Sequence, residues 1–91
     1  SKTETYESLT NYISINFDGL KDAVVRVLVG ETSKVNTDSF ENDVTSFKSR
    51  DDVLTVLIHL GYLAYDRDRR EVYIPNEEIR SAFSNAVQKS D

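Results

Sequence analysis

The chain has 91 residues, so we expect one domain with a single, modest core. Its net charge of −5 argues against a dedicated nucleic-acid-binding protein, because such proteins usually present a basic face. The absence of cysteine excludes disulfides and thiolate metal sites, and there is neither a membrane-length apolar run nor a signal-peptide pattern. We therefore expect a cytoplasmic protein without a membrane partner. Because it begins at Ser1 and lacks methionine, the chain is expected to be a fragment of a longer protein.

Two helices are predicted in the first thirty residues. Apolar residues at helical spacing predict an amphipathic helix near the start of the chain. Asn16 or Asp18 can cap a second helix, and Gly30 ends it. Because several β-branched valines weaken this second helix, tertiary packing has to hold it. The inward faces of the two helices are predicted to carry Tyr6, Leu9, Tyr12, Ile13, Leu20, Val24, Val27 and Leu28.

A short strand and a short helix are predicted next. Residues 32–35 are the candidate edge strand. Phe40, Val44 and Phe47 fall at positions i, i+4 and i+7, which places them on one face of a helix.

The most apolar stretch of the chain predicts a buried central helix. Ser49 can accept a hydrogen bond from the first helical turn, and Asp52 can reach back to the Ser49 N–H. Residues 53–60 are apolar on most of the helix circumference, which is typical of a central helix. We therefore expect Leu57 to be deeply buried and Gly61 to end the helix in the left-handed conformation.

A hairpin and a last helix complete the predicted elements. Two β-prone runs, residues 62–65 and 71–74, are joined by the charged stretch 66–70. Pro75 ends the second run, because proline cannot donate to a strand ladder. Asn76 is expected to cap the last helix, whose apolar stripe is Ile79, Phe83 and Val87.

The order of these elements predicts one domain over residues 1–91, with loose ends at residues 1–5 and 88–91. Its class is α+β, mostly helical. It is winged-helix-like: a helical bundle carries a C-terminal β-hairpin, the wing, and a final helix. A different helical bundle with an appended hairpin is the alternative.

Catalytic constellations are poorly supported by the residues. The one histidine, His59, lies within the central helix and cannot supply a metal-ligand set alone. The carboxylate pairs 51–52 and 77–78 lie in first helical turns, where the helix dipole explains them. No glycine precedes a lysine, which excludes a P-loop. We therefore expect this chain not to be an enzyme and to hold no metal or cofactor.

DNA binding has to be weighed, because winged helices often bind DNA. Two aspartates at the start of the central helix would repel phosphates. Three arginines and three carboxylates alternate over residues 66–71, which predicts a solvated, salt-bridged turn. The expected exposed positions of the central helix are Arg50, Asp51, Asp52, Thr55 and His59. The candidate DNA contacts are Lys48, Arg50, Arg67, Arg69 and Arg70.

Partner binding is the remaining class. Three tyrosines lie on or beside the hairpin, and exposed tyrosines are common at protein interfaces. Alternation puts Leu63 and Tyr65 on the opposite face of the strand from Tyr62, so at least one tyrosine can be exposed. Packing of the tyrosines over the last helix is the equal alternative. The candidate interaction residues are Tyr62, Tyr65, Arg67, Arg69, Arg70 and Tyr73.

Several segments resemble one known family. They are FDGLKD at residues 17–22, VNT at 35–37, FEND at 40–43, FKSRDDVLTVLIHLGYLAYD at 47–66 and YIPNEEIR at 73–80. They resemble the middle region of predicted AAA-ATPase-like proteins from anaerobic bacteria, which end in a PD-(D/E)XK nuclease-superfamily domain. The family's Walker motif is absent here. No acidic residue stands two positions before a lysine, so no catalytic residue is carried over.

The resemblance implies a bacterial chain that joins an ATPase-like module to a nuclease-like module. We therefore expect a non-catalytic connector or protein-interaction domain, whose partners are the flanking domains or another protein. ATP and Mg²⁺ would belong to the parent protein only. The alternative is a winged-helix DNA-binding module of the same protein, which the net charge disfavours.

Overall fold

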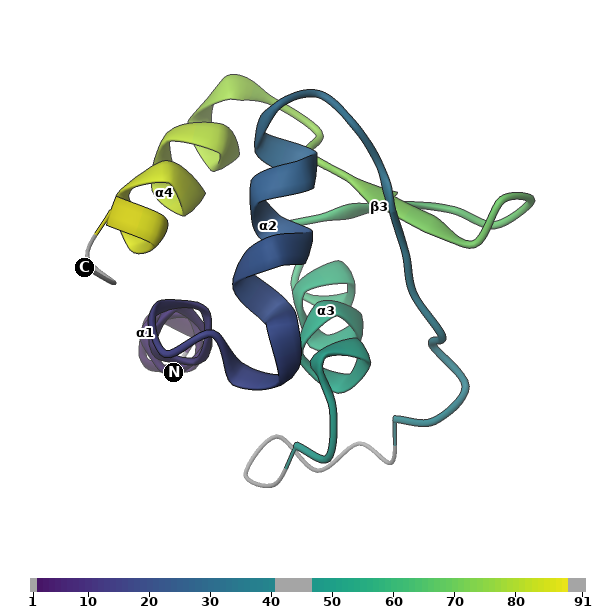
Figure 1. Cartoon of the computed structure of the whole chain (residues 1–91), viewed down its shortest axis with the longest axis horizontal. Coiled ribbons are helices and arrows are strands. Elements are labelled where there is room, and N and C mark those ends of the chain that lie inside the picture. The colour runs from purple at the N-terminus through teal and green to yellow at the C-terminus, as the bar shows by residue number, and fades with distance from the viewer. Residues whose placement is uncertain (1, 41–46, 89–91) are drawn as a thin grey trace.

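The computed structural model describes residues 2–40 and 47–88, with side chains from Glu7 onward (Figure 1). The fold is α+β, mostly helical and winged-helix-like, which confirms the predicted class. Figure 1 shows the hairpin tip projecting away from the helices. The elements are α1 (Lys2–Ser14), a 3-10 turn η1 (Phe17–Gly19), α2 (Leu20–Leu28), β1 (Ser33–Lys34), α3 (Arg50–His59), β2 (Ala64–Asp66), β3 (Glu71–Tyr73) and α4 (Glu77–Gln88).

The three strands form one antiparallel sheet in the order β1-β3-β2. β3 is the central strand, and its Val72 lies opposite Ser33 of β1 and Tyr65 of β2. The predicted edge strand is thus confirmed as β1, although it is only two residues long. The short helix predicted around Phe40, Val44 and Phe47 falls largely on residues 41–46, which lie outside the described residues.

The end of α3 explains why β2 starts later than predicted. Gly61 has a φ of +86°, as expected for a glycine that ends a helix, and its N–H donates to the Ile58 carbonyl at 3.0 Å. The N–H groups of Tyr62 and Leu63 both donate to the Leu57 carbonyl, at 2.9 and 3.2 Å. These two residues therefore belong to the cap of α3, and the strand begins at the following residue.

α3 is the central helix of the domain, as predicted. Residues 52–57 are all buried, and Leu57 has no exposed surface (0%). α1, α2 and α4 pack against one another, and the Ser14 hydroxyl donates to the Ala86 carbonyl at 3.3 Å. The buried hydrophobic core includes Leu9, Ile13, Leu20, Ala23, Val24, Val27, Val35, Val53, Leu54, Val56, Leu57, Leu63, Val72, Phe83 and Ala86.

The start of α3 differs from the prediction. Ser49 is the N-cap residue but makes no side-chain hydrogen bond to the first turn. The Asp52 carboxylate reaches past Ser49 and accepts the Lys48 N–H at 2.8 Å. The Arg50 N–H donates to the carboxylate of Asp18 in η1 at 2.9 Å. A carboxylate from a distant segment thus takes the place of the predicted Ser49 cap, because tertiary packing brings η1 against α3.

The helices follow the predicted order, but α1 begins earlier and α4 ends later than predicted. α1 already begins at Lys2, within the stretch that we expected to be loose, and α4 extends to Gln88. Of the two predicted capping residues, Asn16 serves α2, because its side-chain oxygen accepts the Lys21 N–H at 2.9 Å. Asp18 serves α3 instead.

Candidate interaction surface

The loop at the tip of the hairpin, residues 67–70, is held by local contacts, and we call it the wing loop. The Asp66 carboxylate accepts the N–H groups two and three residues further on, at 3.0 and 3.1 Å. Arg70 has a left-handed φ of +56°, and its carbonyl accepts the Val35 N–H at 3.1 Å. The Asp66 carboxylate and the hydrogen bond from Val35 therefore fix the backbone of the wing loop, and its side chains extend from a well-defined backbone conformation.

The three arginines of the wing loop are exposed, and none forms an ion pair with another described residue. The salt-bridged turn that the sequence predicts therefore does not form within the described part of the chain. Two of the expected carboxylate partners bind elsewhere. Asp66 holds the turn, while Glu71 lies 3.5 Å from the Lys34 ammonium and accepts the Thr32 hydroxyl at 3.0 Å. The arginines in question are Arg67, Arg69 and Arg70.

The three hairpin tyrosines differ in exposure. Tyr73 of β3 is 43% exposed, so one exposed tyrosine is confirmed. Tyr62 and Tyr65 are half-buried and pack against the core. The alternation of faces explains the difference, because Tyr65 lies opposite the buried Val72 whereas Tyr73 is the next residue along β3.

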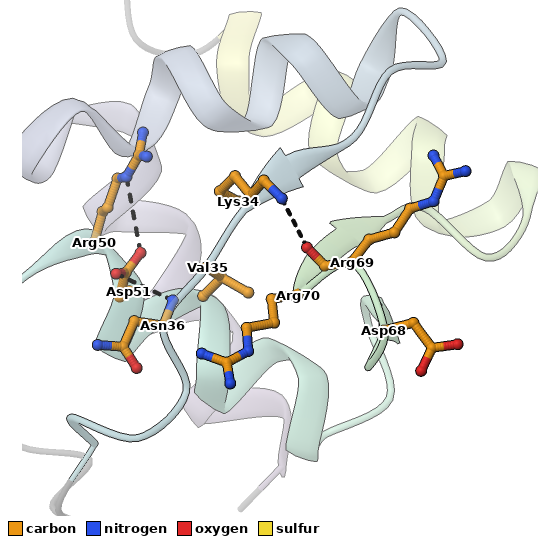
Figure 2. Close-up of a pocket in the computed structure, with 8 residues that line it drawn as sticks. All are labelled: Lys34, Val35, Asn36, Arg50, Asp51, Asp68, Arg69 and Arg70. Carbon is orange, nitrogen blue, oxygen red and sulfur yellow. Dashed lines mark hydrogen bonds and ion pairs between the residues drawn. The ribbon is translucent and has the colours of Figure 1, made fainter.

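A first depression lies between the wing loop and the start of α3, with a volume of about 530 Å³ (Figure 2). On its α3 side, the Asp51 carboxylate accepts the Asn36 N–H at 3.2 Å and lies 3.9 Å from the Arg50 Nε. On its sheet side, the Lys34 ammonium donates to the Arg69 carbonyl at 2.9 Å. Its lining residues are Lys34, Val35, Asn36, Arg50, Asp51, Asp68, Arg69 and Arg70.

The second depression, of about 400 Å³, adjoins the first. The two share Val35, Asn36 and Arg70, so they form one continuous surface, which we call the wing face. His59 is exposed here. Its ring packs edge-on against the Phe40 ring, with the two ring centroids 6.0 Å apart. The lining residues are Val35, Asn36, Thr37, Asp38, Ile58, His59, Tyr65, Arg67 and Arg70.

Charge is unevenly distributed between the wing face and the rest of the molecule. The wing face holds five of the eleven Lys and Arg residues but only three of the sixteen Asp and Glu residues. It therefore carries a formal charge of +2 on a chain whose total is −5. The near balance of charges along residues 66–71 conceals this surplus, because Asp66 and Glu71 do not line the wing face, and the two cations and two carboxylates that other segments add cancel.

Only some of the residues at the start of α3 and along it are exposed, as a DNA-recognition helix would require. Lys48 is exposed and Arg50 is partly exposed. Asp52 and Thr55, which we expected to be exposed on α3, are 5% and 1% exposed. The Thr55 hydroxyl donates to the Asp51 carbonyl at 2.7 Å within the helix. The prediction of an exposed α3 face is therefore wrong at two of its five positions, because α3 is buried around most of its circumference.

The end of β1 and the segment that follows it were missed as part of the site. Lys34, Asn36 and Asp38 all line the wing face, although they lie 29 to 33 residues before the start of the wing loop. The predicted strand at residues 32–35 was the one signal that could have found them. Its pairing with β3 could not be inferred, because it joins segments that are distant in the chain.

Comparisons with protein-family models, curated proteins and solved structures find no match to this chain. The resemblance to the middle region of AAA-ATPase-like proteins therefore stays a prediction. Among the described residues, no helix is long and apolar enough to cross a membrane. Where side chains are described, residues 7–40 and 47–88, there is also no group of three or more His, Cys, Asp or Glu residues placed to hold a metal ion.

Proposed function

We propose that this chain is a non-catalytic connector or protein-interaction domain that docks a partner through its wing face. The observation that supports this most is the set of exposed wing-loop arginines, which have no ion-pair partner among the described residues. The predicted resemblance indicates the candidate partners: the ATPase-like and nuclease-like domains on either side, or another protein.

The fixed backbone of the wing loop favours such docking. Asp66 and Val35 already hold the loop, so little conformational freedom would be lost when a partner binds. An arginine guanidinium can also bind a carboxylate with two parallel hydrogen bonds, which adds geometric specificity. Surface complementarity, rather than chemistry on a substrate, is the mechanism we propose.

Calorimetric titration of this chain with each flanking domain of the parent protein, purified separately, tests the proposal. Arg69→Ala removes one exposed wing-loop side chain and is expected to weaken docking. The control is Arg26→Ala, because Arg26 is also exposed but lies on α2, where it pairs with Glu31 at 3.2 Å. Docking that is equally strong in Arg69→Ala and in the unaltered chain contradicts the proposal.

A winged-helix DNA-binding module is the second candidate, and the cationic surplus of the wing face favours it. The start of α3 argues against DNA binding. The Arg50 N–H already donates to the Asp18 carboxylate, and the Asp51 carboxylate lies beside the Arg50 side chain. Titration with a short DNA duplex at low and near-physiological salt distinguishes the two, since phosphate-mediated binding weakens steeply with salt. Salt-sensitive binding that Lys48→Ala and Arg50→Ala both weaken would replace our proposal.

A further inference from the structure

The cations of the wing face are spread out rather than gathered around one point. Figure 2 shows the guanidinium groups of Arg50 and Arg69 directed to opposite sides of the first depression, with Arg70 between them. Arg67 lines the second depression instead. A single small anion cannot contact all four groups. The arrangement therefore fits an elongated ligand that carries several negative charges.

The carboxylates on the same surface distinguish between two kinds of elongated anion. Asp38, Asp51 and Asp68 line the two depressions. A nucleic-acid strand carries a phosphate at every nucleotide, and these carboxylates would repel it. A polypeptide varies its charge residue by residue, so it can place carboxylates against the arginines and hydrogen-bond donors against the aspartates. The mixed charge of the wing face therefore favours a polypeptide.

Side chains, rather than backbone pairing, would recognise this polypeptide. The N–H groups of Val35, Asn36 and Asp38 all donate within the chain already, at 3.1, 3.2 and 2.9 Å. The segment after β1 therefore offers no free N–H at these three positions to an added strand. Ile58 and Tyr65, both half-buried, give the second depression an apolar part that can receive one apolar side chain.

We infer that the docked partner is an acidic, extended polypeptide segment that crosses both depressions of the wing face. This inference rests on the proposed docking function and names the chemistry of its partner. The segment places carboxylates on Arg67, Arg69 and Arg70, and an apolar residue against Ile58 and Tyr65.

Fluorescence anisotropy with a labelled ten-residue acidic peptide, in which glutamates alternate with serines and one central position is leucine, tests the inference, with a short DNA duplex and oligothymidylate as competing probes. Arg67→Gln, Arg69→Gln and Arg70→Asn each remove one charge, and asparagine tolerates the left-handed backbone of residue 70. Each variant is expected to weaken binding of the acidic peptide about two- to fivefold, the range of one exposed ion pair. Arg26→Gln, with the same charge change on α2, is expected to leave the affinity unchanged. Thermal unfolding confirms that each variant is folded.

Three results would overturn the inference. The first is binding of duplex or oligothymidylate more tightly than the acidic peptide. The second is no binding of the acidic peptide at low salt, and the third is equal weakening by Arg26→Gln and the wing-loop variants. If a flanking domain still docks through the wing loop while the acidic peptide does not bind, this inference fails and the proposed function stands. If neither docks, both fail.

Discussion

Replacing Asp52 by alanine tests how the start of the central helix is held. Asp52 is 5% exposed, and its carboxylate accepts the Lys48 N–H at 2.8 Å and the Ser39 hydroxyl at 3.5 Å. A hydrogen bond to a charged group contributes about 1.5–3 kcal/mol. A carboxylate in the first helical turn adds about 0.3–1 kcal/mol through the helix dipole. Asp52→Ala removes all of these interactions, so we expect the free energy of unfolding to fall by about 2–4 kcal/mol.

Asp51 is the matched control for this experiment, because it is the adjacent residue with the same charge. Its side chain is 27% exposed, and its contacts to the Asn36 N–H and the Arg50 Nε measure 3.2 and 3.9 Å. These longer, more exposed contacts predict a cost of only about 0.5–1.5 kcal/mol for Asp51→Ala. Urea unfolding followed by circular dichroism measures both, provided that the m-value is unchanged. Equal costs for the two variants would refute the distinction between a buried and a surface carboxylate.

Substitutions at three further residues test the core, the long-range cap and the helix end, each by urea or thermal unfolding. Leu57→Ala is expected to cost about 2–5 kcal/mol, because Leu57 is fully buried, and a near-neutral change would mean that the core is misplaced. Asp18→Ala removes the acceptor of the Arg50 N–H at a residue with φ of +48°, so we expect a loss of about 1–3 kcal/mol. Asp18→Asn keeps an acceptor and should cost clearly less; an equal cost would show that the cap is not the cause. Gly61→Ala should cost about 1–2 kcal/mol from the left-handed backbone alone, because nothing lies within 4 Å of an added Cβ, and a much larger loss would contradict that open space.

Local patterns were sufficient to predict most elements of this fold. The apolar run of residues 53–60 identified the central helix, and Gly61 marked its end, because both depend on neighbouring residues only. The hairpin and the edge strand were also predicted, although their bounds were too wide. Tyr62 illustrates why: its N–H closes the helix cap, and a strand propensity cannot reveal that competing bond.

The features that required tertiary contacts were not predictable from local patterns. Nothing in the sequence separates the buried Asp52 from the partly exposed Asp51, or shows that Asp18 would cap a helix more than thirty residues away. The wing loop was misjudged for the same reason. Its arginines lack ion-pair partners within the described residues partly because Lys34, from a distant strand, binds Glu71.

The measurement that most directly tests the proposed docking function is chemical-shift mapping of the ¹⁵N-labelled chain during titration with the flanking domains that the resemblance predicts. Our account predicts shifts at the wing face, centred on residues 67–70 and 34–38, with little change on the outer face of α2 around Val25. Shifts centred on α2 instead, or no shifts with any flanking domain, would contradict the claim that the wing face is the docking surface.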